Sequence, residues 1–229
     1  MDKSIFDILR NDEKVKAYIK AGDDALRTLG FTEHSFTHVC KTAKTASDIL
    51  TDLGYGEKNA ELSRAAGLLH DIGNMVNRSN HALTGAVIAE NILSNHEYDL
   101  PYHEIAAIVS AIGNHDEETG RPVNIIAAAL ILADKSDVRR SRVYETEMDK
   151  ILADIHDRVN YAVTNGSISA GINKDSGAKK IVLNLDIDAS VCSVMDYFEI
   201  FLSRMLMCRR AAAYLDAEFD LIINNLKIM

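Results

Sequence analysis

The sequence predicts a mainly α-helical protein with a small β-hairpin near the C-terminal end and a closing helix after the hairpin. Three observations favour this class. Only two of the 229 residues are proline, no low-complexity tract or internal repeat interrupts the chain, and apolar residues recur at helical spacing between short turns of Gly, Asn and Asp. A chain of this length can bury a substantial core. We therefore expect a helical bundle with a modest appendage.

Helices are expected one after another in the first half of the chain. The first ends at Gly30. Its apolar stripe consists of Val15, Ile19, Leu26 and Leu29. A second helix, over residues 35–53, stops at Gly54, because glycine suits the position after a helix C-terminus. A third helix is expected over residues 57–69. A fourth begins after a cap at Ser79 or Asn80 and carries the apolar residues Leu83, Val87, Ile88 and Ile92. A fifth runs from Pro101 to Ile112.

The segment VNIIAAALILADKSDV is apolar on nearly every side. This pattern is typical of a helix buried on most of its faces. Its acidic residue Asp134 would therefore enter the interior, where a carboxylate needs a partner.

The pattern of apolar and polar residues changes after about Ser141. Residues 148–163 resemble one helix, and two strands, Ser167–Ala170 and Lys180–Asp186, flank an NKDSG turn. The stretch from Ala189 to about Asn225 is helical in pattern and closes the fold, either on the body of the protein or on a second subunit of a homodimer. We divide the chain into an N-terminal helical segment (1–30), a core (31–142) and a C-terminal extension (143–229).

Composition excludes several classes of function. The formal net charge of −9 and the sequence pI near 5.3 disfavour binding to long nucleic acid, although a small phosphorylated ligand needs only a few cations or a metal. The cysteines Cys40, Cys192 and Cys208 have no metal-finger spacing, so we expect free thiols in a reducing compartment, by default the cytoplasm. We expect no export signal and no membrane span, because charges interrupt every long apolar run.

The adjacent pair His70-Asp71 is the strongest chemical signal. It follows an apolar helical run, with His38 upstream and Asp134 downstream. Imidazoles and carboxylates together suit Fe, Mn, Co, Ni or Zn better than Ca. The pattern therefore predicts a site for a divalent transition metal.

Three segments carry a resemblance to a known family: TEHSFTHVCKTAKTASDIL, AAGLLHDIGN and AALILADKSDVRR. Their order and spacing resemble the HD-domain phosphohydrolase superfamily over about Phe31 to Arg142, which implies that residues 31–142 form a helical catalytic core. In the first segment His38 matches the ligand better than His34, because small or apolar helical positions follow it. His34 is the second choice.

Two further segments, NHALTGAVIAENIL and IVSAIGNHDEE, resemble those that supply a second metal in dinuclear members. On this resemblance one ion is held by His38, His70, Asp71 and Asp134. The other is held by His81 and His115, with Asp71 bridging, since one carboxylate can span two ions. Without a metal, His81 would cap a helix or face solvent, and His115 would lie in a polar turn.

The resemblance implies hydrolysis of a phosphoester or phosphoanhydride of a small substrate, with nucleotides and dinucleoside polyphosphates as the nearest class. A metal-activated water at Asp71 would attack, and Lys135 and Arg140 would contact the phosphates. Arg140 could instead pair with Asp137 on its own helix. Arg139 belongs with Lys135 and Arg140 among the best candidates for phosphate binding, and Lys41, Asn74 and Arg78 are weaker ones. Asn74 stands where many members have lysine, so their substrate specificity does not transfer.

The sequence leaves two other functions open. Some members with the same ligands are di-iron oxygenases, and others are non-catalytic modules that bind a nucleotide. The acidic run Asp116, Glu117 and Glu118 could supply an acid or base, but such runs are usually solvated. We expect His96, His103 and His156 to lie at the surface.

Overall fold

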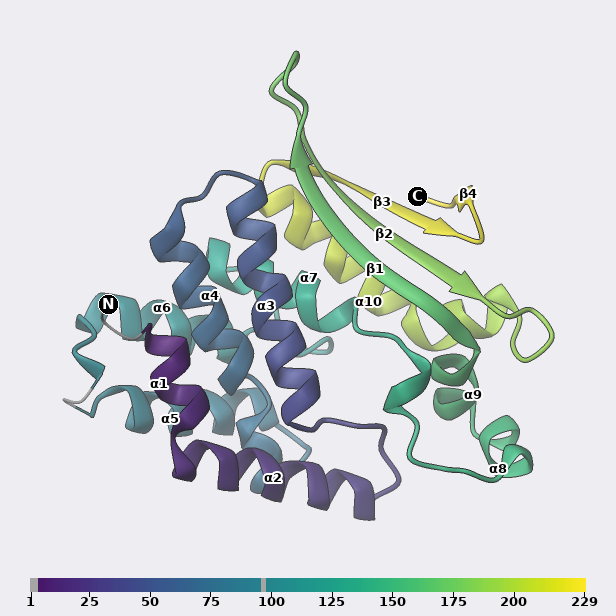
Figure 1. The fold of residues 1–229 in the computed structure, drawn as a ribbon, viewed down its shortest axis with the longest axis horizontal. Coiled ribbons are helices and arrows are strands. Elements are labelled where there is room, and N and C mark those ends of the chain that lie inside the picture. Colours follow the sequence, from purple (N-terminus) through teal and green to yellow (C-terminus); the bar gives the residue numbers. More distant parts are fainter. Residues whose placement is uncertain (1–3, 96–97) are drawn as a thin grey trace.

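The computed structural model describes residues 4–95 and 98–229, so His96 lies outside the described residues. Figure 1 shows a bundle of helices with a curved sheet along one side of it. The predicted mainly α-helical class is confirmed, and the expected C-terminal β-hairpin is present as two strands of a larger sheet. The elements of the bundle are α1 (Ile5–Asn11), α2 (Glu13–Thr28), α3 (Phe36–Asp52), α4 (Glu57–Leu69), the 3-10 turn η1 (Ile72–Met75), α5 (His81–Leu93), α6 (Tyr102–Gly113) and α7 (Ile125–Lys135).

Capping interactions set several of these boundaries. The Ser35 hydroxyl accepts a hydrogen bond from the backbone N–H of Thr37 and so begins α3. Helix α5 begins differently, because Asn80 has a left-handed backbone (φ 62°) and its side chain makes no capping bond. Leu83 and Val87 on α5 are exposed. The buried face of α5 is instead made of Ala82, Ala86, Ala89, Ile92 and Leu93.

Helix α7 lies between two hydrophobic cores, which explains why its sequence is apolar on nearly every side. Ile126, Ala127 and Leu130 belong to the core shared with α1 to α6. Ala128, Ile131 and Leu132 belong to a second core with α10 and the sheet. The prediction of a helix buried on most faces is confirmed.

The C-terminal part adds a sheet and three helices to the bundle. Its elements are η3 (Arg140–Arg142), α8 (Met148–Ala153), α9 (Ile155–Ala162), β1 (Val163–Ile172), β2 (Lys179–Ile187), α10 (Val194–Tyr214), β3 (Ala217–Ile223) and β4 (Leu226–Lys227). The strand order is β1-β2-β3-β4, with β1–β2 and β3–β4 antiparallel and β2–β3 parallel. The parallel register pairs Lys179 with Ala217 and Leu185 with Ile223. Helix α10 packs on β3 and α7, which ties the sheet to the bundle (Figure 1).

Two expectations for this part were wrong. The single helix expected over 148–163 is broken at Asp154, whose side chain caps α9 by accepting from the backbone N–H groups of His156 and Asp157. The closing helix ends at Tyr214 instead of near Asn225. After a left-handed turn at Asp216 (φ 52°) the chain forms β3. Its alternating buried residues, among them Phe219, Leu221 and Ile223, have the period of a strand.

No helix within residues 4–95 and 98–229 combines the length and hydropathy needed to cross a bilayer.

Candidate metal centre

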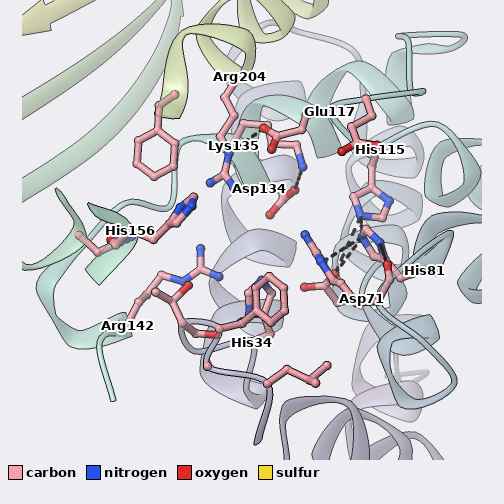
Figure 2. Close-up of a pocket in the computed structure, with 18 of the residues that line it drawn as sticks. His34, Asp71, His81, His115, Glu117, Asp134, Lys135, Arg142, His156 and Arg204 are labelled. Atoms are coloured by element: carbon pink, nitrogen blue, oxygen red, sulfur yellow. Dashed lines mark hydrogen bonds and ion pairs between the residues drawn. The ribbon is translucent and has the colours of Figure 1, made fainter. Parts of the chain in front are cut away.

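Six side chains from separate parts of the chain meet at one point of the bundle. His38 lies on α3, His70 and Asp71 join α4 to η1, and His81 is the first residue of α5. His115 follows the end of α6, and Asp134 lies near the end of α7. They form three overlapping groups, each with ligand atoms within 4.8 Å of one another: His38, His70 and Asp71; His70, His115 and Asp134; and Asp71, His81 and His115. The residues predicted from the sequence as ligands are thus brought together (Figure 2 shows Asp71, His81, His115 and Asp134).

Two glycines allow the close packing that this convergence requires. A Cβ atom on Gly67 would lie 2.5 Å from Cα of Ala43, so α4 can approach α3 only because position 67 has no side chain. A Cβ atom on Gly73 would lie 2.0 Å from the carbonyl oxygen of His81. Gly67 therefore brings His70 to His38, and Gly73 brings η1 against the start of α5.

One cluster of donor atoms is left without a protein partner. The Nε2 atoms of His38 and His70 and the Oδ2 atom of Asp71 are buried and have no hydrogen-bond partner. His38 Nε2 lies 3.6 Å from Asp71 Oδ2, and His70 Nε2 lies 3.2 Å from that oxygen. The same two nitrogens lie 3.4 and 3.6 Å from Oδ1 of Asp134. Because burying unpaired polar atoms is costly, this arrangement fits a cation between them.

The second oxygen of Asp71 faces the other pair of histidines. Its Oδ1 atom lies 3.6 Å from His81 Nε2 and 3.9 Å from His115 Nε2. The amide of Asn74 donates a hydrogen bond of 2.9 Å to the same oxygen. Asn74 therefore orients the carboxylate shared by both groups.

Each histidine of the centre has its Nδ1 atom next to an oxygen. His70 Nδ1 lies 2.8 Å from the Gly67 carbonyl, His81 Nδ1 3.1 Å from that of Arg78, and His115 Nδ1 2.6 Å from that of Ile112. His38 Nδ1 instead lies 2.8 Å from the Asp137 carboxylate. These contacts require a proton on Nδ1, so every Nε2 atom is available as a ligand.

The electrostatics of the centre favour bound cations. Burial disfavours the charged form of His70, but the carboxylates of Asp71 and Asp134 outweigh it and raise its pKa to about 10. The pKa of His115 is lowered to about 3, mainly by burial and further by the nearby charges of His70 and Lys135. Burial also lowers the pKa of His81. In the metal-free centre a proton on His70 thus balances the carboxylates, and a divalent cation can replace it.

A cavity of about 380 Å³ opens beside the centre (Figure 2). Its polar and aromatic lining includes His34, Arg78, Glu117, Lys135, Arg142, Asp154, His156, Phe201 and Arg204. Lys135, predicted as a phosphate contact, is buried, and its Nζ atom lies 2.7 Å from Oδ2 of Asp134. His34 lines the cavity but is in none of the three ligand groups.

Arg140 does not lie where the sequence analysis expected it. It is exposed, its guanidinium stacks 4.3 Å from the centre of the Tyr161 ring, and its Nε atom donates to the Tyr161 carbonyl. Arg142 lines the cavity instead, because it lies at the end of the turn η3. His156 is exposed, as expected, yet its ring faces the cavity (Figure 2).

Arg204, Arg142 and the role of Asp137 were not predicted from the sequence. Arg204 reaches the cavity from α10, far from the ligand motifs in sequence, and no motif could have indicated this. Asp137 gave a weak signal, since it lies three residues after the ligand Asp134.

Fold and site together define a class: a helical bundle whose buried His and Asp side chains can hold divalent metal. The sequence model of the HD domain family matches residues 35–159, more than half of the chain. The chain belongs to the HD domain family. The match extends past Arg142, the boundary expected for the core, through most of α9.

The chain is also similar to several individual proteins. It is 26% identical to the uncharacterized protein MJ1020 of Methanocaldococcus jannaschii over 202 residues, 80% of this chain and 77% of that protein. It is 31% identical to ribonuclease Y of Opitutus terrae over 113 residues, 48% of this chain and 19% of that enzyme. Ribonuclease Y of Lactobacillus helveticus is 27% identical over 195 residues, 76% of this chain and 34% of that enzyme. The chain thus spans between a fifth and about a third of the ribonuclease Y proteins.

Proposed function

We propose that this protein is a metal-dependent phosphohydrolase that cleaves a phosphoester or phosphoanhydride bond of a small phosphorylated substrate, with nucleotides as the first class to test. The main support is the set of unpartnered ligand atoms of His38, His70 and Asp71 beside a cavity of about 380 Å³. Membership of the HD domain family and similarity to ribonuclease Y agree with hydrolysis of a phosphorus–oxygen bond.

We further propose that the centre holds two divalent transition metal ions. His38, His70, Asp71 and Asp134 would hold one, and Asp71, His81 and His115 the other. When bound, such ions supply Lewis acidity and lower the pKa of water towards about 7, which provides a nucleophile at neutral pH. The support is the shared carboxylate, because Oδ2 of Asp71 faces one pair of histidines and Oδ1 the other.

The protein's own side chains would orient the reactants. Lys135 binds one oxygen of Asp134 and leaves the other facing His38 and His70, and its position in the cavity lining allows its ammonium to contact a phosphoryl oxygen. Burial, and then the charge of Arg142, hold the pKa of His34 well below the usual value for histidine. The ring of His34 would therefore be neutral and could form a hydrogen bond with the substrate. Burial of the centre keeps bulk water from the ligands, which strengthens electrostatic stabilisation of the transition state.

The size and charge of the protein favour a small substrate. Ribonuclease Y acts on RNA by its name, and this chain covers only part of it. A net charge of −9 repels a long polyanion. A short RNA oligonucleotide therefore belongs in the substrate screen as the comparison for mononucleotides.

The decisive experiment combines metal analysis with a substrate screen. We would measure the metal content of the purified protein and assay nucleotides, dinucleoside polyphosphates, simple phosphomonoesters and short RNA with Mn, Co, Ni and Fe under anaerobic conditions. The expected result is hydrolysis of at least one of these substrates, measured as its phosphate or nucleotide product, that is lost in Asp71→Asn and retained in Asp149→Asn, a matched change at an exposed residue. Full turnover and full metal content in Asp71→Asn would refute the proposal.

Two alternative functions predict other outcomes. A di-iron oxygenase of this fold would consume O2 and release no phosphate under anaerobic conditions. A nucleotide-binding module would bind nucleotide without turnover at any metal.

A further inference from the structure

Arg142 is a guanidinium that the fold holds rigidly at the cavity. Only 5% of its side chain is exposed. Its Nε and Nη2 atoms donate to the Glu33 carbonyl at 2.9 and 2.7 Å, and Nη1 donates to the Asp137 carbonyl at 2.9 Å. These bonds use three of the five N–H groups of a guanidinium, and their acceptors carry no net charge. The Asp137 carboxylate lies 3.9 Å away and already binds Lys41 and Arg139.

Arg204 approaches the same space from α10. Figure 2 shows its guanidinium and that of Arg142 pointing from opposite sides into the space beside Asp134, with the His156 ring next to them. Arg204 is fixed by an Nε bond of 2.8 Å to Glu117 and by the face of Phe201, 4.4 Å from its guanidinium carbon. Its Nε contact leaves the terminal nitrogens free to bind a ligand.

The two guanidinium groups are close enough to affect each other. Burial is the main cause that lowers the pKa of Arg142, and the charge of Arg204 lowers it further, although Asp137 and Asp134 oppose both. Like charges that face one space become favourable when an anion lies between them.

The acidic residues around the cavity leave this space to an anion. Asp134 pairs with Lys135, Glu117 with Arg204, and the Asp154 carboxylate caps α9. Asp71 faces the histidines of the metal centre, and Glu118, whose side chain is exposed, is the other acidic residue of the lining. The planar fork of arginine suits a phosphoryl group, which accepts two parallel N–H bonds.

We propose that Arg142 and Arg204 form a second subsite, which binds the phosphoryl group adjacent to the one held at the His/Asp centre. The inference rests on the proposed function. It narrows the substrate class to phosphoanhydrides and related compounds with two neighbouring phosphoryl groups. Arg204 lies outside residues 35–159, the part matched by the family, so the C-terminal extension sets this specificity.

The test uses three small probes that resist hydrolysis and carry no base: methylphosphonate, methylenediphosphonate and phosphonoacetate. Affinity for the metal-loaded protein would be measured by isothermal titration calorimetry, with metal content checked after each titration. We expect methylenediphosphonate to bind roughly tenfold or more tightly than methylphosphonate, because charged hydrogen bonds have about this value. Equally tight binding of phosphonoacetate would overturn the preference for a second phosphoryl group over a carboxylate.

Variants assign the preference to the subsite. Arg204→Met should remove the preference for methylenediphosphonate while methylphosphonate affinity stays, and Arg209→Met, an exposed arginine on the same helix, should retain it. Glu117→Gln should strengthen methylenediphosphonate binding, because Arg204 loses its competing partner. If Arg204 only positions Glu117, both variants will weaken binding alike, and the proposal fails. Arg142→Lys, which keeps the charge but not the fork, should also reduce the preference.

The two proposals can fail separately. Phosphate release that is unaffected by Arg204→Met for every substrate would remove the subsite and leave the hydrolase. Selective binding of methylenediphosphonate without turnover of any phosphorylated compound would remove the hydrolase and leave the subsite.

Discussion

Nδ1 of His38 lies 2.8 Å from Oδ2 of Asp137, a residue 99 positions further along the chain. Asp137 is buried, and its other oxygen is bound by Lys41 at 2.7 Å and by Arg139 at 3.0 Å. The carboxylate is therefore fixed, and it fixes the ring of His38 so that Nε2 faces Asp71 and Asp134. A carboxylate behind a ligand histidine is a common device for orienting it and raising its basicity.

Replacement of Asp137 by asparagine should weaken metal binding roughly 10- to 100-fold, because His38 loses the charged group that orients it. Competition with a chromophoric chelator would measure the affinity. Asp149→Asn, at an exposed position, is the control. Unchanged affinity in Asp137→Asn would mean that packing alone orients His38.

Replacement of His81 by alanine should lower the bound metal from two ions per chain to one, since His81 faces only Oδ1 of Asp71. His70→Ala should cost more metal, because His70 belongs to two of the three ligand groups. Elemental analysis of the purified proteins would give the stoichiometry. His103→Ala, at an exposed residue of α6, should bind as much metal as the unaltered protein, and equal losses in His81→Ala and His103→Ala would contradict a second ion.

Removal of metal by a chelator should lower the unfolding temperature by about 5 to 10 °C for an ion present at about 100 times its dissociation constant. The reason is that Nε2 of His38 and His70 and Oδ2 of Asp71 are buried without a hydrogen-bond partner, and a single proton on His70 compensates the carboxylates less well than a divalent ion. Differential scanning calorimetry before and after re-addition of metal would measure the shift. The shift should vanish in Asp71→Asn, and a shift of the same size in that variant would show that the chelator acts elsewhere.

The acid stability of the sheet should depend on Asp220. Its oxygens lie 2.7 Å from the ammonium of Lys180 and 2.8 Å from that of Lys227. Burial opposes ionisation, but hydrogen bonds from the two lysines outweigh it and lower the pKa of Asp220 below its ordinary value. A group with a lowered folded-state pKa stabilises the protein above its unfolded-state pKa, about 4, and this stabilisation is lost as the pH falls towards the folded-state value.

Urea unfolding of Asp220→Asn would check this dependence. The variant should be less stable than the unaltered protein at pH 7, and the difference should shrink as the pH falls below about 4. A difference that stays constant down to pH 2 would show that Asp220 acts through packing and not through its charge.

The ligand set was predictable because its residues occur in short motifs. His70-Asp71 ends a helix that an apolar pattern predicts, and Asp134 lies in a helix that is apolar on nearly every side. The apolar patterns thus predicted the helices, and the polar residues that break these patterns were the ligands. The prediction of these helices also needed only local patterns and end signals, as the boundaries of α4 illustrate.

The cavity was less predictable because distant segments build it. Arg140 and Arg142 are two residues apart, and only the turn through η3 directs one to Tyr161 and the other to the cavity. Arg204 comes from a helix whose sequence pattern indicated nothing except packing. The end of that helix was missed for a related reason, since the strand Ala217–Ile223 is short and its apolar residues also fit a helix until the turn at Asp216 is known.

Helix α7 has a thermodynamic consequence for the whole molecule. Its two sides are packed into different cores, and its last turn carries Asp134 and Lys135. Loosening of the sheet would remove the packing on one side of this helix and so disturb the position of Asp134. The sheet and the centre should therefore protect their backbone amides against hydrogen exchange as one cooperative unit, and occupancy of the centre should slow exchange in the distant strands β2 and β3.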